Sequence, residues 1–406
     1  QEMSFDLFAY RKLQDTAADC EDRCDQIERE MRDPKAAERF ALKQSQAFVD
    51  QMEGFALELE DELMNFSDVS YKSFVKSESE IITLFYDKFA DIPLLSRMDA
   101  VAETFIDEIE TLLNRDLPEE ERIPLIEKFR KMYETMDFYV LYNRFLKKEG
   151  YQTLPRRPLE KRKLRYEDVY PVLYLKYRLS RQAERSNIKH LVIDEMQDYS
   201  RLQYLIIRRM FSCKMTILGD RAQTMADQQQ DVLQFLPGIF GKDLRRIEMR
   251  KSYRNTVEIA SYAANLIGVT DLELFERHGI PVVERDVTDL EAALREAVDT
   301  LFSDEKTYET AAVIVPDEKT AERAYLILRE ILVEKDFDCE KRLSWLNRDS
   351  SSFKKGLTVT TFYLAKGLEF DQVFSIFPKD EKREMMMQAQ YIAATRALHE
   401  LRVYHI

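Results

Sequence analysis

The sequence lacks several features that would place it in a broad class. No apolar run approaches the roughly 20 residues that a membrane span needs, and the first residues carry no signal-peptide core. Only four cysteines are spread over 406 residues. Cys20 and Cys24 lie one helical turn apart, without a nearby histidine or second cysteine pair to complete a zinc site. This usage suits a reducing cytoplasm, and we expect no membrane partner.

Glycine is also scarce, with nine residues in the whole chain. They are too scattered to form G-x-x-x-x-G-K-[ST], and that pattern occurs nowhere. The chain therefore has no glycine-rich loop to cradle phosphates and no loop lysine for the β- and γ-phosphates.

Charge is distributed unevenly along the chain, whose net charge is −14. Residues 1–120 hold 13 Lys/Arg against 30 Asp/Glu, a net of −17, and the other 48 basic and 45 acidic residues give +3. The acidic part would repel DNA phosphates and would be attracted to a basic channel built for nucleic acid. The alternative is an ordinary solvated helical face.

Residues from about 5 to 150 are predicted to be nearly all helical, because their apolar residues recur at helical spacing and glycine is almost absent. Four X-Pro steps, at Pro34, Pro93, Pro118 and Pro124, are interpreted as turns. Long helices with few breaks suggest an arm inserted into another domain.

A basic, proline-bounded stretch at 154–165 is interpreted as a linker, with a nucleic-acid contact as the alternative. After it, short apolar runs alternate with amphipathic segments, which indicates a parallel, doubly wound α/β sheet. Expected strands lie at 191–193, 215–218, 311–315, 357–361, 373–377 and 401–406. Expected helices lie at 167–180, 199–211, 256–267, 319–333 and 387–397. Trp345 falls in a polar loop.

Two of the expected strands end in acidic residues. His190–Ile193 leads into Asp194 and Glu195, and Met215–Leu218 leads into Gly219 and Asp220. The carboxyl edge of a parallel sheet is where nucleotide-binding folds do their chemistry. There, one acid could hold Mg²⁺ and its neighbour could orient or deprotonate a water. The alternative is a strand capped by solvated acids.

Five segments in order resemble motifs of superfamily 1 helicases of the UvrD/Rep type. Three of them are I-D-E-M-Q-D (193–198), L-G-D-R-A-Q (218–223) and R-K-S-Y-R-N-T (250–256), similar to motifs II, III and IV. The others are T-F-Y-L-A-K-G-L-E-F-D (361–371) and Y-I-A-A-T-R-A (391–397), similar to motifs V and VI. The resemblance implies RecA-like, P-loop NTPase lobes that use ATP and Mg²⁺.

Two departures from the UvrD pattern resemble the helicase IV/HelD branch, whose Gram-positive members bind RNA polymerase. Tyr363 stands where UvrD members usually have histidine. Thr224 and Met225 stand where motif III of DNA-translocating members commonly has an aromatic. In the family the phosphate loop precedes everything seen here. We therefore expect a fragment that follows that loop and is inactive by itself.

The resemblance also implies a role for particular residues. Asp194 would contact Mg²⁺ through water, Glu195 would polarise the attacking water, and Gln223 would sense the γ-phosphate. Arg254 and Arg396 would serve as arginine fingers, because a guanidinium fork matches the charge of a transferring phosphoryl group. Tyr253 would stack on adenine, and Gly367 and Glu369 would complete the nucleotide site. Taken singly, Tyr253 would be interpreted as a core tyrosine and Lys366-Gly367 as an ordinary turn.

The resulting hypothesis is a HelD-like ATP-dependent helicase or translocase that remodels or recycles RNA polymerase–nucleic-acid complexes. Its expected parts are an acidic helical arm (1–150), the end of a first RecA-like lobe (151–250) and a second lobe (251–406). Its expected partners are RNA polymerase, DNA and the missing phosphate-loop segment. One alternative is a repair or recombination helicase that tracks single-stranded DNA. Another is a non-catalytic binding module.

Overall fold

The computed structural model describes most of the chain. The described residues are 4–181, 188–220, 223, 232–241, 244–249, 251–269, 273–303, 308–335, 338–348, 350, 355–379 and 383–406. They form two compact units. Unit 1 is Gln1–Ile193, Tyr199–Ile217 and Val232–Lys242, and unit 2 is Asp194–Asp198, Leu218–Asp231 and Asp243–Ile406. Within the described ranges, no helix combines the length and apolarity that crossing a membrane requires.

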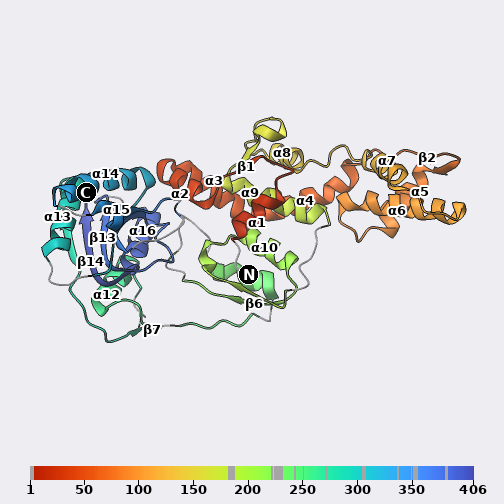
Figure 1. Ribbon diagram of the computed structural model, residues 1–406. Helices are drawn as coiled ribbons and strands as arrows, with labels where there is room; N and C mark the ends of the chain where they lie inside the picture. Colours follow the sequence, from red (N-terminus) through yellow and green to blue (C-terminus); the bar gives the residue numbers. More distant parts are fainter. Residues whose placement is uncertain are drawn as a thin grey trace. The chain divides into compact units, whose positions relative to one another are not determined.

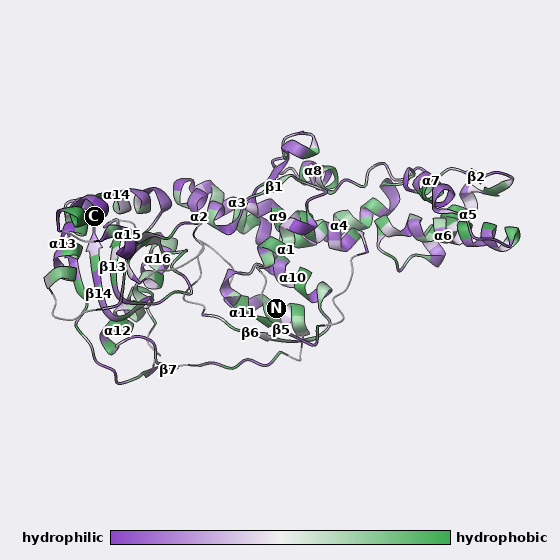
Figure 2. Ribbon diagram, viewed as in Figure 1, coloured by the Kyte–Doolittle hydropathy of each residue, from purple (hydrophilic) through white to green (hydrophobic). Residues whose placement is uncertain are grey.

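Unit 1 is mainly helical (Figure 1). Its helices are α1 (Phe5–Lys12), α2 (Arg23–Arg32), α3 (Pro34–Gln44), α4 (Gln46–Glu62), α5 (Glu78–Thr83), α6 (Leu94–Leu113), α7 (Glu119–Arg130), α8 (Phe138–Lys148), α9 (Tyr166–Leu179), α10 (Arg201–Met210) and α11 (Val232–Phe240). Hydrophobic and hydrophilic residues alternate along them (Figure 2), as expected of helices that each bury one face.

Short strands complete unit 1. β1 (Asp19–Cys20) pairs in parallel with β4 (Lys163–Leu164), and β5 (His190–Ile193) pairs in parallel with β6 (Lys214–Ile217). β2 (Val69–Tyr71) and β3 (Phe74–Lys76) form an antiparallel hairpin. The hairpin interrupts a region expected to be nearly all helical. Lys72 stands in its turn with a φ of 53°, in the left-handed region that tight turns use.

The centre of unit 1 is α9, in which every residue except Arg178 is buried. It contacts α1, α2, α3, α4, α8 and α10. Its buried carboxylates are paired, as burial of charge requires. Lys43 donates to Asp168 over 2.5 Å, and Arg29 lies 3.0 Å from Glu167.

The proline steps differ in their effect. Pro34 opens α3, and Pro93 and Pro118 directly precede α6 and α7, so these three lie at breaks between helices, where turns were predicted. Pro124 lies inside α7, and the turn predicted there is wrong. It sits in the second turn of the helix, near the end where a missing N–H is best tolerated.

Unit 2 is built on a six-stranded sheet in the order β11-β12-β10-β13-β14-β9, in which every neighbouring pair is parallel. Its strands are β9 (Val283–Asp286), β10 (Thr310–Val315), β11 (Leu343–Trp345), β12 (Gly356–Thr361), β13 (Phe370–Phe377) and β14 (Ala397–His405). A further parallel pair joins β7 (Lys251–Ser252) to β8 (Glu273–Leu274). Trp345 thus ends a strand and does not lie in a loop, which corrects the sequence interpretation.

Helices cover both faces of this sheet (Figure 1). The set is α12 (Val257–Leu266), α13 (Leu290–Ser303), α14 (Glu318–Glu334), α15 (Cys339–Arg342) and α16 (Glu384–Thr395). α13 and α14 share a core with alternate residues of β10 (Ala311, Val313, Val315). α12 and α16 contact each other and β14. The expected mixed α/β fold with parallel sheets is confirmed, and the three-part domain division stays a prediction.

Candidate nucleotide site

The first functional segment directly follows β5. Asp194 is exposed, and its carboxylate accepts a hydrogen bond of 2.9 Å from the amide of Glu195. Glu195 has a φ of 52°, a left-handed conformation that is uncommon for residues other than glycine. Such strain costs about 1–3 kcal/mol and is concentrated at functional positions. The backbone therefore turns sharply at the acid that was predicted to handle the attacking water.

Gln197 links this segment to the one that follows β6. Its amide nitrogen donates to Glu195 over 2.6 Å, and its amide oxygen accepts from the backbone N–H of Asp220 over 3.1 Å. The two segments also share a backbone bond of 2.8 Å from Met196 to Leu218. The contact is so close that a Cβ at position 219 would lie 2.4 Å from the Gln197 side chain, so Gly219 is required.

Lys366 follows β12 and lies beside two of these acids. Its ammonium donates to both carboxylate oxygens of Asp198 at 2.7 Å and lies 3.4 Å from Glu195. The Lys366 side chain is 7% exposed, so the pair with Asp198 is largely removed from water. Gly367, with a φ of 82°, turns the chain directly after it.

Arg396 ends α16 and is almost fully buried, at 1% exposure. Its guanidinium donates to the side-chain oxygen of Gln223 over 3.2 Å. Burial, and then repulsion from nearby Arg254, lower the pKa of Arg396 to about 10, while Glu195 and Glu369 oppose that shift. Arg396 therefore stays positively charged at neutral pH.

Asp220 joins the same network. Its carboxylate accepts hydrogen bonds from the Gln223 amide at 3.0 Å and from the Tyr391 hydroxyl at 3.2 Å. Burial, followed by the charge of Asp220, raises the pKa of Tyr391, which holds the phenol neutral as a donor. Gln223 is thereby held between an acid and Arg396.

The remaining predicted residues lie at the rim of this network. Arg254 forms an ion pair of 2.7 Å with Glu369, and both side chains are more than 40% exposed. Tyr253 is 61% exposed, with its ring 5.5 Å from that of Phe275. Tyr253 is thus no core tyrosine, and the ammonium of Lys251 lies over its ring, 5.4 Å from the centroid.

The structure therefore brings Glu195, Gln223, Arg254, Glu369 and Arg396 into one electrostatic neighbourhood within unit 2. Sequence reasoning assigned no role to the third acid of the first segment, Asp198, or to its partner Lys366. Both residues lie inside the recognised motifs, at 193–198 and 361–371. Their place in these motifs was the sequence feature that could have identified them.

The acids fit a magnesium ion only in part. Among the described residues, no group of three or more histidine, cysteine or acidic side chains is placed to hold a metal. Mg²⁺ in phosphoryl-transfer sites is commonly bound by one or two carboxylates, with water and substrate phosphates as the other ligands. The exposed carboxylate of Asp194 suits that arrangement.

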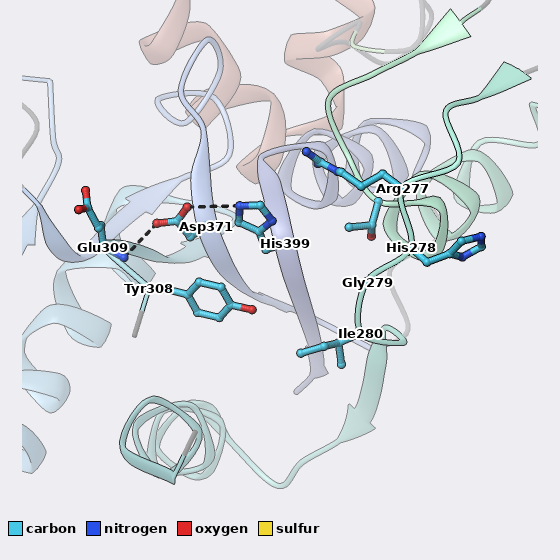
Figure 3. Close-up of a pocket in the computed structure, with 9 residues that line it drawn as sticks. Arg277, His278, Gly279, Ile280, Tyr308, Glu309, Asp371 and His399 are labelled. Atoms are coloured by element: carbon cyan, nitrogen blue, oxygen red, sulfur yellow. Dashed lines mark hydrogen bonds and ion pairs between the residues drawn. The ribbon is translucent and has the colours of Figure 1, made fainter. Parts of the chain in front are cut away.

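A separate pocket of about 390 Å³ lies at the amino ends of β10, β13 and β14. Figure 3 shows Asp371 between the backbone of Glu309 and the ring of His399, with Arg277 on another wall. Asp371 accepts from the N–H of Glu309 over 3.0 Å and lies 3.7 Å from His399. None of the predicted nucleotide-site residues lines this pocket.

These features define an α/β protein with parallel sheets and a site rich in acids and arginines next to strand ends. Residues 3–225, more than half of the chain, match the UvrD/REP helicase N-terminal domain. The chain belongs to the UvrD/REP helicase family, and membership implies ATP use, usually with Mg²⁺. A comparison with curated proteins gave no match.

Several solved helicases are similar in part. The C-terminal domain of a possible DNA helicase from Lactobacillus plantarum WCFS1 is 23% identical, with a TM-score of 0.31, over 38% of this chain and 88% of that one. The PRRSV helicase is 14% identical, with a TM-score of 0.31, over 66% and 45%. Arterivirus nonstructural protein 10 (helicase) in complex with DNA is 15% identical, with a TM-score of 0.29, over 66% and 51%. This chain thus spans about half of each viral helicase.

Proposed function

We propose that this chain supplies the γ-phosphate side of the ATP site in an ATP-dependent superfamily 1 helicase. The observation that carries the proposal is the buried Arg396 bound to Gln223, with Glu195 in the same neighbourhood. A fixed cation, a polar sensor and an acid are the groups that phosphoryl transfer needs.

In this proposal, Glu195 orients the attacking water and accepts its proton. Arg396 and Arg254 stabilise the charge that develops on the γ-phosphate oxygens. Gln223 contacts the γ-phosphate, Tyr253 stacks on the base, and Gly367 and Glu369 border the nucleotide. Bound Mg²⁺ would neutralise phosphate charge beside Asp194. The phosphate loop would come from a part of the protein outside this sequence, and the chain by itself would be inactive.

Lys366 has a clear place in this scheme. It sits 2.7 Å from Asp198 and 3.4 Å from Glu195, so it holds positive charge beside the proposed base. Through charge attraction at this distance, the Lys366 ammonium helps to fix the carboxylate of Glu195 where the proposal needs it.

The finer proposal is a HelD-like protein that remodels or recycles RNA polymerase–nucleic-acid complexes in the cytoplasm. Two features support it. Residues 1–120 carry a net charge of −17, which favours a basic partner surface over DNA phosphates. Tyr363 stands where the UvrD branch usually has histidine, and this departure resembles the HelD branch. In this scheme residues 1–150 are an inserted arm that engages the polymerase.

The test is ATP turnover by the full-length protein that contains this chain, compared with its Glu195→Gln variant. Glu284→Gln, which changes an exposed acid of unit 2, is the matched control. Stimulation by core RNA polymerase, with co-purification that needs residues 1–150, would support the remodeller. Stimulation by single-stranded DNA alone, with strand displacement, would indicate a DNA-tracking helicase. Turnover that is absent, or independent of Glu195, would leave a binding module.

A further inference from the structure

Two side chains with no assigned role connect the backbone around Arg254 to the backbone around Arg396 through hydrogen bonds. The first is Asn255, which is 7% exposed. Its amide nitrogen donates to the carbonyl of Thr395 over 3.1 Å and to that of Ala397 over 2.7 Å. An amide nitrogen has two hydrogens, and both are used on the two neighbours of Arg396.

The second side chain is Arg277, which directly precedes a turn that packs on the start of α12. Its guanidinium donates to the carbonyl of Arg254 and, over 2.9 Å, to that of Leu398. A planar guanidinium with several fixed donors suits such bridging of two carbonyls. We call Asn255 and Arg277 together the carbonyl clamp.

The segment around Arg277 is itself anchored to the start of α12. The carbonyl of Arg277 accepts from the N–H of Val257 over 2.9 Å. Glu258 accepts from the N–H of Gly279 over 2.8 Å and lies 2.9 Å from the ring of His278. A Cβ at position 279 would lie 2.6 Å from the Thr256 methyl carbon. The clamp residue is therefore held on a well-packed turn.

Without the clamp, the two arginines would be expected to move apart. Burial is the main cause that lowers the pKa of Arg396, and repulsion from Arg254 lowers it further. Arg254 is more than 40% exposed and has only the similarly exposed Glu369 as its ion-pair partner among the described contacts. Hydrogen bonds that oppose this repulsion are needed to keep both cations directed at the same phosphate oxygens.

We propose that Asn255 and Arg277 are positioning residues that fix Arg254 and Arg396 relative to each other for γ-phosphate transfer. The inference rests on the proposed function for the role of the arginines, and on the hydrogen bonds of Asn255 and Arg277 for the clamp. A displacement of about 1 Å in a catalytic group can cost about 100-fold in rate. Loss of either clamp side chain should therefore lower kcat to about that extent and leave KM nearly unchanged.

The experiment measures kcat and KM for ATP in the full-length protein with Arg277→Ala, Asn255→Asp and the milder Asn255→Ser. Arg285→Ala, which removes an exposed arginine of the same unit, is the control. In an Arg254→Ala background the clamp variants should cause little further loss, because one of the two groups whose relative placement they fix is gone. Folded variants with unchanged kcat, or losses that multiply with that of Arg254→Ala, would overturn the proposal.

Hydrogen exchange separates this proposal from the proposed function. Arg277→Ala should speed amide exchange at 253–256 and 395–398 and leave β10 and β12 protected, whether or not ATP is hydrolysed. Unchanged exchange at both segments would mean that the clamp does not hold them. Faster amide exchange, combined with ATP turnover that Glu195→Gln does not change, would support the clamp and refute the ATPase assignment.

Discussion

The pair formed by Lys366 and Asp198 gives a quantitative test of how the site is held together. At 2.7 Å and an effective dielectric constant of about 20, the attraction between unit charges is about 6 kcal/mol. Removing the lysine from water offsets most of this, because its side chain is only 7% exposed. We expect a net coupling of about 1.5–3 kcal/mol, typical of hydrogen bonds to charged groups.

The two single substitutions should differ. Among the described residues, Asp198→Asn leaves the buried ammonium with Glu195 and the Gln223 carbonyl, each 3.4 Å away, and it should cost about 3 kcal/mol. Lys366→Met removes the buried charge itself and leaves Asp198, whose side chain is 25% exposed, accessible to water. It should cost clearly less.

The chain supplies its own reporter for this measurement. Its one tryptophan, Trp345, lies in the sheet of unit 2 and stacks on Tyr325 at 6.0 Å. Urea unfolding followed by tryptophan emission therefore reads the stability of unit 2, and a double-mutant cycle gives the coupling. The reasoning is refuted if Lys366→Met costs as much as Asp198→Asn, or if the two costs add to within about 0.5 kcal/mol.

Two further predictions concern unit 2. Gly219→Ala would place a Cβ 2.6 Å from the backbone nitrogen of Met196, so it should cost about 1–3 kcal/mol in the same urea assay, and an unchanged midpoint would contradict this. A hydrogen bond from His278 is the main cause that lowers the pKa of Glu258 from 4.5 to about 2. Because the folded value is depressed, this stabilisation is present above pH 4.5 and is lost as pH falls toward about 2. Glu258→Gln should flatten that acid slope, and an unaltered slope would exclude Glu258 as its source.

The regular elements were predictable where the apolar pattern was strong. β10, β12, β13, α9 and α14 lie within a few residues of their expected ranges, because continuous apolar runs and helical spacing mark buried elements. β9, with the sequence V-E-R-D, was missed, since an edge strand with exposed residues lacks such a run. β11 was missed because three residues, Leu-Ser-Trp, are too few to show a period.

The site was predictable to the extent that motif order identifies residues. Motif order named Glu195, Gln223 and Arg396, whose proximity the structure now gives, while their chemical roles stay proposals. It could not find Arg277, which lies outside every motif and acts on two backbone carbonyls far away in the sequence. A donor to carbonyls needs no particular partner residue, so it leaves no pattern to recognise. Arg221, Arg250, Thr224 and Met225 lie outside the described residues.

The position of β14 in its sheet has a consequence for synthesis. Among the described strands, β9 pairs with β14 alone, and β14 lies between β13 and β9. On the ribosome, β9 therefore leaves the exit tunnel long before the strand it pairs with exists. Until residues 397–405 emerge, its backbone donors and acceptors have only water or another chain as partners. The polar V-E-R-D sequence reduces the risk of aggregation during that interval, and replacing it with apolar residues should lower the yield of soluble protein more than it lowers the stability of the finished fold.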